Sequence, residues 1–162
     1  MTKLQAAPTW HISQWFNSAP LALADLRGKV VLLHAFQMLC PACAAQALPQ
    51  MQRLHRAFSA QPLAVIGLHT VFEHHQVQTP AALEVFLHEY RYAFPVGVDQ
   101  HADGDPLPLT MRDYAMQGTP TMLLIDAEGR LREHHFGVVE DLVLGVAIGQ
   151  LLAEARTNAP AD

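Results

Sequence analysis

Residues 28–43 read GKVVLLHAFQMLCPAC, which is a turn, an unbroken apolar run and two cysteines separated by two residues. A short apolar run bounded by a turn is typical of a strand buried on both faces of a sheet, and we expect such a strand at residues 30–33. From Pro41 onward, apolar residues recur with helical spacing. A proline suits the first turn of a helix because its missing N–H would have no partner there. The sequence therefore predicts a Cys-x-x-Cys motif at the junction between a strand and a helix.

The rest of the chain alternates between strand-like and helix-like segments. We expect Pro49 to kink the helix after the cysteines, and a second helix to open with Thr79 as its cap and Pro80 in its first turn. Residues 126–129, DAEG, form a hairpin turn between two later strands. The expected strands are residues 21–24, 30–33, 63–68, 94–98, 121–125 and 131–136, and the expected helices are residues 41–58, 81–92, 109–116 and 139–155. This order predicts an α/β fold with a parallel core sheet, an antiparallel edge and helices on both faces.

Length and composition indicate one globular domain. The chain has 162 residues, of which 51% are hydrophobic and 15% charged. A chain of this size buries a core without disulfide staples or structural metals. We expect a single domain over residues 1–162, with its core at about residues 20–155 and an apolar cluster before residue 20 laid against that core. That cluster consists of Trp10, Ile12, Trp15 and Phe16.

Charge and hydropathy bear on partners and location. The net charge of −5 and the lack of a basic stripe exclude a nucleic-acid partner. No apolar run reaches the ~18 residues that a membrane span needs. Residues 1–8 hold one lysine and no apolar segment, unlike a secretory signal. We therefore expect a cytoplasmic protein, or a periplasmic one if a leader has been removed.

Cys40 and Cys43 are the candidate catalytic residues. Unpaired N–H groups and the dipole at a helix N-terminus favour the thiolate of Cys40, which is the attacking species in disulfide exchange. Cys43 follows one turn later and can resolve the mixed disulfide. The alternatives are two buried structural cysteines or a zinc site, which would need histidine ligands because there is no second Cys-x-x-Cys. We expect neither a metal nor a cofactor, and we expect the other histidines, including His69, at the surface or in loops.

Four stretches in this order resemble the thioredoxin superfamily, and within it the TlpA-like and redoxin (AhpC/TSA-related) branch. They are the strand and cysteines at residues 28–43, FPV at residues 94–96, GTPT at residues 118–121 and LIDAEGR at residues 124–130. The resemblance extends over residues 20–155. It implies a thioredoxin-like fold, with a mixed central β-sheet and helices on both faces. It also implies a thiol-disulfide oxidoreductase that acts on disulfide- or thiol-containing protein substrates and is served by a redox partner.

The resemblance assigns substrate-binding roles near the cysteines. Thr119-Pro120 is similar to the family's cis-proline dipeptide, whose preceding backbone pairs with the substrate chain much as an added strand would. An ordinary trans turn proline is the alternative. Leu39, Pro41 and Gln37 are the other expected substrate-binding residues. Leu39 stands where thioredoxins usually carry a tryptophan, so the flat contact surface of that side chain is missing.

His34 and Gln46 depart from the family pattern. His34 occupies the position of a buried acid that handles the proton of the second cysteine. An imidazole whose pKa stays near 6.5 can accept that proton, provided that burial does not depress the pKa too far. The alternative is a core histidine that only fills space. Gln46 stands where many TlpA-like chains have a glutamate, and the loss of that negative charge predicts a more oxidising pair of thiols.

Two other functions stay open on the sequence. A peroxiredoxin-like thiol peroxidase would use Cys40 as its peroxidatic cysteine and Cys43 as its resolving cysteine. That chemistry needs a threonine three residues before Cys40 to hold the peroxide, and Gln37 stands there instead. The second alternative is a non-catalytic redox sensor or binding module that uses the fold as a docking surface. A resolving thiol within the same motif favours disulfide exchange.

Overall fold

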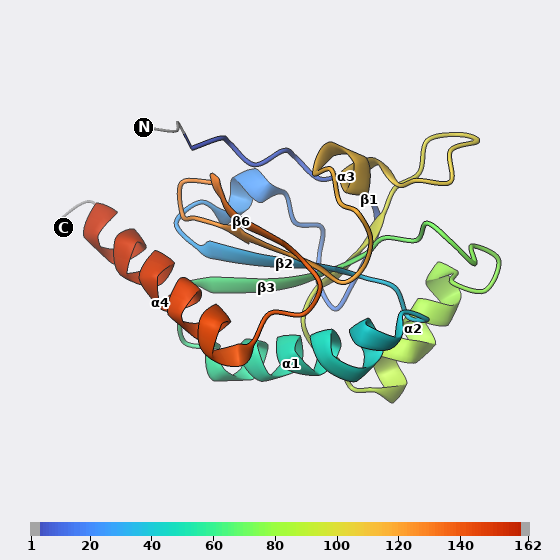
Figure 1. Cartoon of the computed structure of the whole chain (residues 1–162), viewed down its shortest axis with the longest axis horizontal. Helices are drawn as coiled ribbons and strands as arrows, with labels where there is room; N and C mark the ends of the chain where they lie inside the picture. The colour runs from blue at the N-terminus through green and yellow to red at the C-terminus, as the bar shows by residue number, and fades with distance from the viewer. Residues whose placement is uncertain (1–3, 160–162) are drawn as a thin grey trace.

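The computed structural model describes residues 4–159. Its strands are β1 (Ile12–Phe16), β2 (Val30–Phe36), β3 (Leu63–His69), β4 (Val96–Asp99), β5 (Thr121–Ile125) and β6 (Leu131–Phe136). Its helices are α1 (Leu48–Ala57), α2 (Pro80–Glu89), α3 (Leu109–Asp113) and α4 (Asp141–Asn158), with a 3₁₀-helix η1 (Leu23–Leu26) and a π-helical turn η2 (Cys43–Ala47). Figure 1 shows these helices arranged on the two sides of a central sheet.

The sheet has six strands in the order β1-β4-β3-β2-β5-β6. β2, β3 and β4 are parallel, whereas β1 and β5 run antiparallel to β4 and β2, and β6 runs antiparallel to β5. β2 therefore lies inside the sheet, and all 7 of its residues are buried. The expected mixed sheet, with a parallel core and an antiparallel hairpin at one edge, is confirmed.

The side chains of β2 alternate between two apolar clusters, one on each face of the sheet. Val30, Leu32 and Phe36 pack in the larger cluster, which includes Cys43 and buried residues of α1, α2 and α4. The odd-numbered residues of β2 pack in the other cluster, beneath η1 and α3. Because successive residues of a strand point to opposite faces, the even-numbered positions of β2 share the face of the sheet on which Cys43 is buried.

Two segments near the N-terminus differ from expectation. Residues 21–24 are not a strand but lead into η1, in which Leu23 and Leu26 are both buried. Their spacing of three matches the three residues per turn of a 3₁₀-helix, and the alternation with alanine is incidental. The Asp25 carboxylate accepts the N–H of Ala22 at 3.3 Å and holds the first turn. The apolar cluster lies against the core as expected, and the difference is that Ile12, Trp15 and Phe16 belong to the edge strand β1, which pairs with β4.

The helix after the dithiol is irregular ahead of Pro49. The N–H of Leu48 donates to the carbonyl of Cys43, five residues earlier, and this bond defines the π-helical turn. Pro49 has no N–H, and in a regular α-helix its ring would press on the carbonyl of Ala45. The distortion expected at Pro49 is therefore present as a widened turn, and α1 follows it from Leu48.

The second helix begins as expected and ends early. Thr79 Oγ1 accepts the N–H of Ala82 at 3.2 Å, and Pro80 is the first helical residue. Arg91 adopts a positive φ of 54°, and the N–H of Tyr92 turns back to the carbonyl of Leu87 at 3.0 Å. This left-handed residue ends α2 at Glu89 rather than at residue 92.

The packing of α4 on the sheet predicts a large effect of Ile148→Ala. Ile148 is fully buried in the larger cluster, so its truncation should leave a cavity and lower the free energy of unfolding by about 3 kcal/mol. Val146 on the same helix is 73% exposed, and Val146→Ala should change that free energy by less than about 0.5 kcal/mol. Urea unfolding of both variants measures the difference, and equal losses would contradict this packing of α4.

Candidate active site

The dithiol lies where the central strand β2 leads into a helix (Figure 1). After β2, the N–H of Cys40 donates to the carbonyl of Gln37 at 3.2 Å and closes a tight turn. Cys40 and Cys43 form a disulfide with their Cα atoms 5.2 Å apart. Cys40 is partly exposed, whereas Cys43 is fully buried. An incoming molecule can therefore reach the first sulfur and not the second.

Backbone groups surround the sulfur of Cys40. The N–H of Cys43 donates to Cys40 Sγ at 3.3 Å, and the carbonyl oxygen of Thr119 lies 3.5 Å from the same sulfur. Within residues 4–159, neither cysteine forms a hydrogen bond with a charged side chain. In the reduced protein, an N–H aimed at this sulfur from the first turn of a helix stabilises the thiolate.

The loop beside Cys40 contains a cis peptide bond between Thr119 and Pro120, so the expected cis geometry is confirmed. Pro120 is buried, and its carbonyl accepts the N–H of Gly137 at 2.8 Å. Thr121 Oγ1 donates to the carbonyl of Gly118 at 2.7 Å. These bonds hold the loop, and Thr119 is left partly exposed beside the reactive sulfur.

The other residues expected to contact substrate lie in two different environments. Leu39 is 57% exposed and Pro41 is exposed, so both flank Cys40 at the surface. Gln37 is only 1% exposed, and its Oε1 accepts the N–H of Phe72 and a side-chain N–H of Gln78. Gln37 therefore cannot contact a substrate, and its side chain instead packs beneath the turn that carries Cys40.

His34 is buried on the face of the sheet that carries the dithiol. It is 1% exposed, and as an even-numbered residue of β2 it points toward the cluster that contains Cys43. Neither ring nitrogen has a hydrogen-bond partner within residues 4–159. Burial lowers the pKa of His34 to about 4, because the imidazolium would lose its hydration. The ring is neutral at neutral pH, and the proton-acceptor hypothesis loses the pKa near 6.5 on which it depended.

Sequence reasoning missed two buried polar residues at this end of the sheet. His69, expected at the surface or in a loop, ends β3 with 1% exposure and packs against Phe36 with ring centroids 5.2 Å apart. Burial lowers the pKa of His69 to about 4 as well. Extending the predicted strand at residues 63–68 by one position would have placed His69 in β3 and predicted that its side chain is buried. Gln78, which is 3% exposed, lies in a loop where no periodic pattern marks it.

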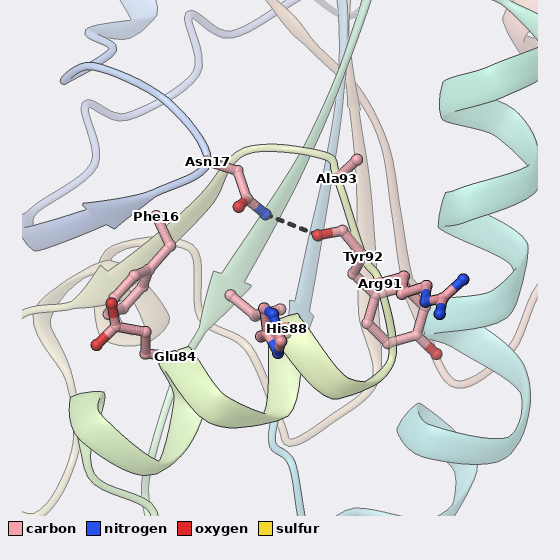
Figure 2. A pocket seen from close by; sticks show the side chains of 8 residues that line it. Phe16, Asn17, Glu84, His88, Arg91, Tyr92 and Ala93 are labelled. Atoms are coloured by element: carbon pink, nitrogen blue, oxygen red, sulfur yellow. Dashed lines mark hydrogen bonds between the residues drawn. The ribbon is translucent and has the colours of Figure 1, made fainter.

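A hollow of about 630 Å³ lies apart from the dithiol, between the end of β1 and α2 (Figure 2). Its lining residues are Phe16, Asn17, Glu84, Leu87, His88, Arg91, Tyr92 and Ala93. Figure 2 shows the Asn17 amide donating to the Tyr92 carbonyl, a bond of 2.8 Å that ties the end of β1 to the segment after α2. Phe16 pairs with Val96 at the start of β4, and none of the lining residues belongs to the turn that carries the dithiol.

Residues 4–159 contain neither a cluster of three metal-ligating side chains nor a membrane-spanning helix. In that range, no three histidine, cysteine, aspartate or glutamate side chains come together as metal ligands. Over the same residues, no helix is long and apolar enough to cross a membrane.

Comparison with known proteins relates the chain to a large group of redox proteins. The sequence profile of the AhpC/TSA family matches residues 5–134. A thioredoxin-like superfamily protein of known structure is 53% identical, with a TM-score of 0.89 over 98% of this chain and 99% of its own. A thiol-disulfide isomerase from Corynebacterium glutamicum is 47% identical, with a TM-score of 0.87 over 91% of this chain and 97% of its own. These structures confirm the thioredoxin-like fold.

A curated relative is much longer than this chain. Protein DipZ from Mycobacterium bovis is 30% identical over 148 residues, which are 90% of this chain and 20% of DipZ. The chain therefore spans about a fifth of the length of the DipZ proteins that it matches.

Two buried neutral histidines predict that acid destabilises the fold. In the folded chain the pKa values of His34 and His69 are about 4, against 6.5 for an ordinary histidine. The unfolded chain therefore binds protons at higher pH than the folded chain. The free energy of unfolding should fall as the pH drops from 6.5 toward 4, by up to about 1.4 kcal/mol per pH unit for each ring. Above this window both rings are neutral in both states and add no pH dependence.

Urea unfolding at a series of pH values measures this effect. His69→Leu should remove about 3 kcal/mol of the acid-induced loss. Leu83, which is fully buried, supplies the control, because Leu83→Ala removes a core side chain but no titratable group and should leave the pH dependence unchanged. Equal acid sensitivity in all three proteins would contradict the prediction.

Proposed function

The chain belongs to the AhpC/TSA family, and on that premise we propose that it is a thiol-disulfide oxidoreductase with Cys40 as nucleophile and Cys43 as resolving thiol. One observation carries the proposal. The two cysteines form a disulfide in which Cys40 is partly exposed, Cys43 is fully buried, and the Cys43 N–H is directed at Cys40 Sγ. This arrangement lets the Cys40 sulfur react with a partner while the Cys43 sulfur stays buried, one helix turn away, for the resolving step.

The exchange takes place in two displacement steps. The Cys40 thiolate attacks one sulfur of a client disulfide, forms a mixed disulfide and releases the other client sulfur as a thiolate, which takes up a proton. Cys43 then loses its proton and attacks Cys40 Sγ, which closes the Cys40–Cys43 disulfide and releases the second client thiolate. The client gains two electrons and the protein loses two. Run in reverse, the same steps oxidise a client dithiol, and a thiol-containing redox partner restores the starting form.

Exposed residues around Cys40 support contact with the client. Leu39 and Pro41 present apolar surface beside the sulfur, and the partly exposed Thr119 presents its backbone next to it. We assign the client an extended segment that lies along Thr119-Pro120 as an added strand would. Gln37 is left out of this contact surface because it is buried.

We assign His34 to the proton of Cys43. Both residues are buried on the same face of the sheet, and the His34 nitrogens are unpartnered while Cys43 is held in the disulfide. Reduction creates an S–H group on that face, and we propose that this group donates to the neutral ring. Burial holds the pKa of His34 at about 4. The neutral ring therefore orients the Cys43 thiol and is protonated only transiently, while the proton leaves Cys43.

A thiol peroxidase is the less favoured function. Gln37 stands at the position where peroxide chemistry needs a threonine hydroxyl, and its amide is turned toward Phe72 and Gln78 inside the protein. A resolving cysteine one turn from the nucleophile also favours disulfide exchange.

The assigned roles of the two cysteines predict opposite behaviour of their serine variants. The reduced protein should accelerate the reduction of insulin by dithiothreitol, and Cys40→Ser should fall to the uncatalysed rate. Cys43→Ser should retain clients as mixed disulfides that a non-reducing gel separates, because nothing resolves them. A wild-type protein without insulin reductase activity, together with a Cys43→Ser variant that traps no client, would point to the binding module instead.

His34→Ala should slow resolution without slowing attack. The reduced protein reacts with an aromatic disulfide that releases a coloured thiolate twice, first on attack by Cys40 and then on resolution by Cys43. The second release should slow roughly tenfold, below the usual range for a lost general base because His34 is a weak one. Leu32→Ala supplies the control, since Leu32 is buried on the same face and its loss leaves a cavity without removing a polar group. Unchanged second-phase rates in His34→Ala would rule out this role.

A further inference from the structure

A pair of buried glutamines lies beneath the turn that carries Cys40. Gln37 follows β2 and is 1% exposed, and Gln78 precedes α2 and is 3% exposed. Neither amide ionises, and disulfide exchange as proposed uses neither of them. Buried polar side chains almost always form hydrogen bonds. The hydrogen-bond partners of Gln37 and Gln78 therefore show which parts of the chain these two side chains hold in place.

The partners of Gln78 determine which way its amide faces. Oε1 accepts the N–H of Leu39 at 3.2 Å, and a backbone N–H can only donate. Nε2 donates to the carbonyl of Glu73 at 2.9 Å, and a carbonyl can only accept. The second hydrogen of Nε2 goes to Gln37 Oε1 at 3.0 Å. An inverted amide would set its oxygen against two acceptors, so one orientation of Gln78 satisfies every contact.

The same reasoning orients Gln37. Its Oε1 receives N–H groups from Gln78 and from Phe72, the latter at 3.3 Å. Its Nε2 therefore faces the other way and lies 3.5 Å from Thr119 Oγ1. The carbonyl of Thr119 lies 3.5 Å from Cys40 Sγ. These contacts form a closed ring. Leu39, next to Cys40, bonds to Gln78, Gln78 bonds to Gln37, and Gln37 lies against Thr119, whose carbonyl is beside the Cys40 sulfur.

The anchor on Leu39 holds the exposed part of the turn that carries Cys40. The turn after β2 is closed by the bond between the Cys40 N–H and the Gln37 carbonyl, and the Leu39 side chain is 57% exposed. Its N–H is held by a side chain from a separate loop, between β3 and α2. Without that acceptor, the turn is free to move outward and to carry Cys40 away from the Cys43 N–H.

We propose that Gln78 is a positioning residue for Cys40. By holding the Leu39 amide, it keeps the Cys40 sulfur against the N–H of Cys43 and so sets the reactivity of the thiolate. The inference rests on the proposed exchange function, because it concerns the same nucleophile. It adds a residue that reaches the dithiol only through the backbone of its neighbour.

The test compares Gln78→Met with Gln52→Met in the reduced protein. Gln52 is a matched control because it is also a buried glutamine bonded to two backbone groups, the Arg91 carbonyl and the Ala93 N–H, in another part of the fold. The pKa of Cys40 is read from the pH dependence of its alkylation by iodoacetamide, located by mass spectrometry. Gln78→Met should raise this pKa by about half a unit to one unit, so that the thiolate fraction near neutral pH falls about three- to tenfold. Gln52→Met should leave this pKa unchanged.

A second variant keeps the test decisive if Gln78→Met does not fold. Gln78→Asn keeps the amide but is one methylene shorter, so it cannot reach the Leu39 N–H from the same backbone position, and the pKa of Cys40 should rise as in Gln78→Met. Equal Cys40 pKa values in the wild type and the folded Gln78 variants would overturn the inference, as would an equal rise in Gln52→Met. Failure of the proposed function is a separate result, since it is seen in the wild type as a lack of insulin reduction.

Discussion

The N–H of Cys43, directed at the sulfur of Cys40 across 3.3 Å, is the contact on which the site depends. It requires one cysteine just beyond the end of a strand and the other within the first turns of the helix that follows. β2 meets the first requirement because β3 and β5 hold it on both sides and apolar clusters bury both its faces. The helix meets the second because Leu48 and Met51 anchor it to the larger cluster. The order of the strands and the placement of α1 therefore hold the Cys43 N–H against the Cys40 sulfur.

Neutral groups make up the surroundings of that junction. Backbone N–H and carbonyl groups lie next to Cys40, two glutamine amides lie beneath it, and His34 and His69 are held uncharged by burial, which lowers the pKa of each to about 4. With no ion pair to the cysteines among residues 4–159, the charge of a thiolate is balanced by dipoles whose direction the fold fixes. The stability of the thiolate should therefore change more with small displacements of the backbone than with salt concentration.

The sequence predicted the parts of this fold that local patterns encode. β5 and β6 were predicted with their observed bounds, because the turn at residues 126–129 and the apolar runs beside it are short-range signals. The dithiol junction and the cis bond at Thr119-Pro120 were also predicted. Local patterns failed where a distant contact decides the conformation. β1 exists because β4 offers it an edge, and the role of Gln78 depends on the Leu39 N–H, which is 39 residues away.

The π-helical turn at Cys43–Ala47 sets how the dithiol is oriented relative to the buried side of α1. Its wider turn holds one residue more than an α-helical turn, so Cys43 and Leu48, although five residues apart, both face the larger cluster. Removing a single residue from Ala44–Ala47 would bring the two parts into one regular register and rotate the dithiol by about 100° relative to the core-facing side. The orientation of the dithiol thus depends on the one extra residue in this turn together with the packing of α1 that follows it.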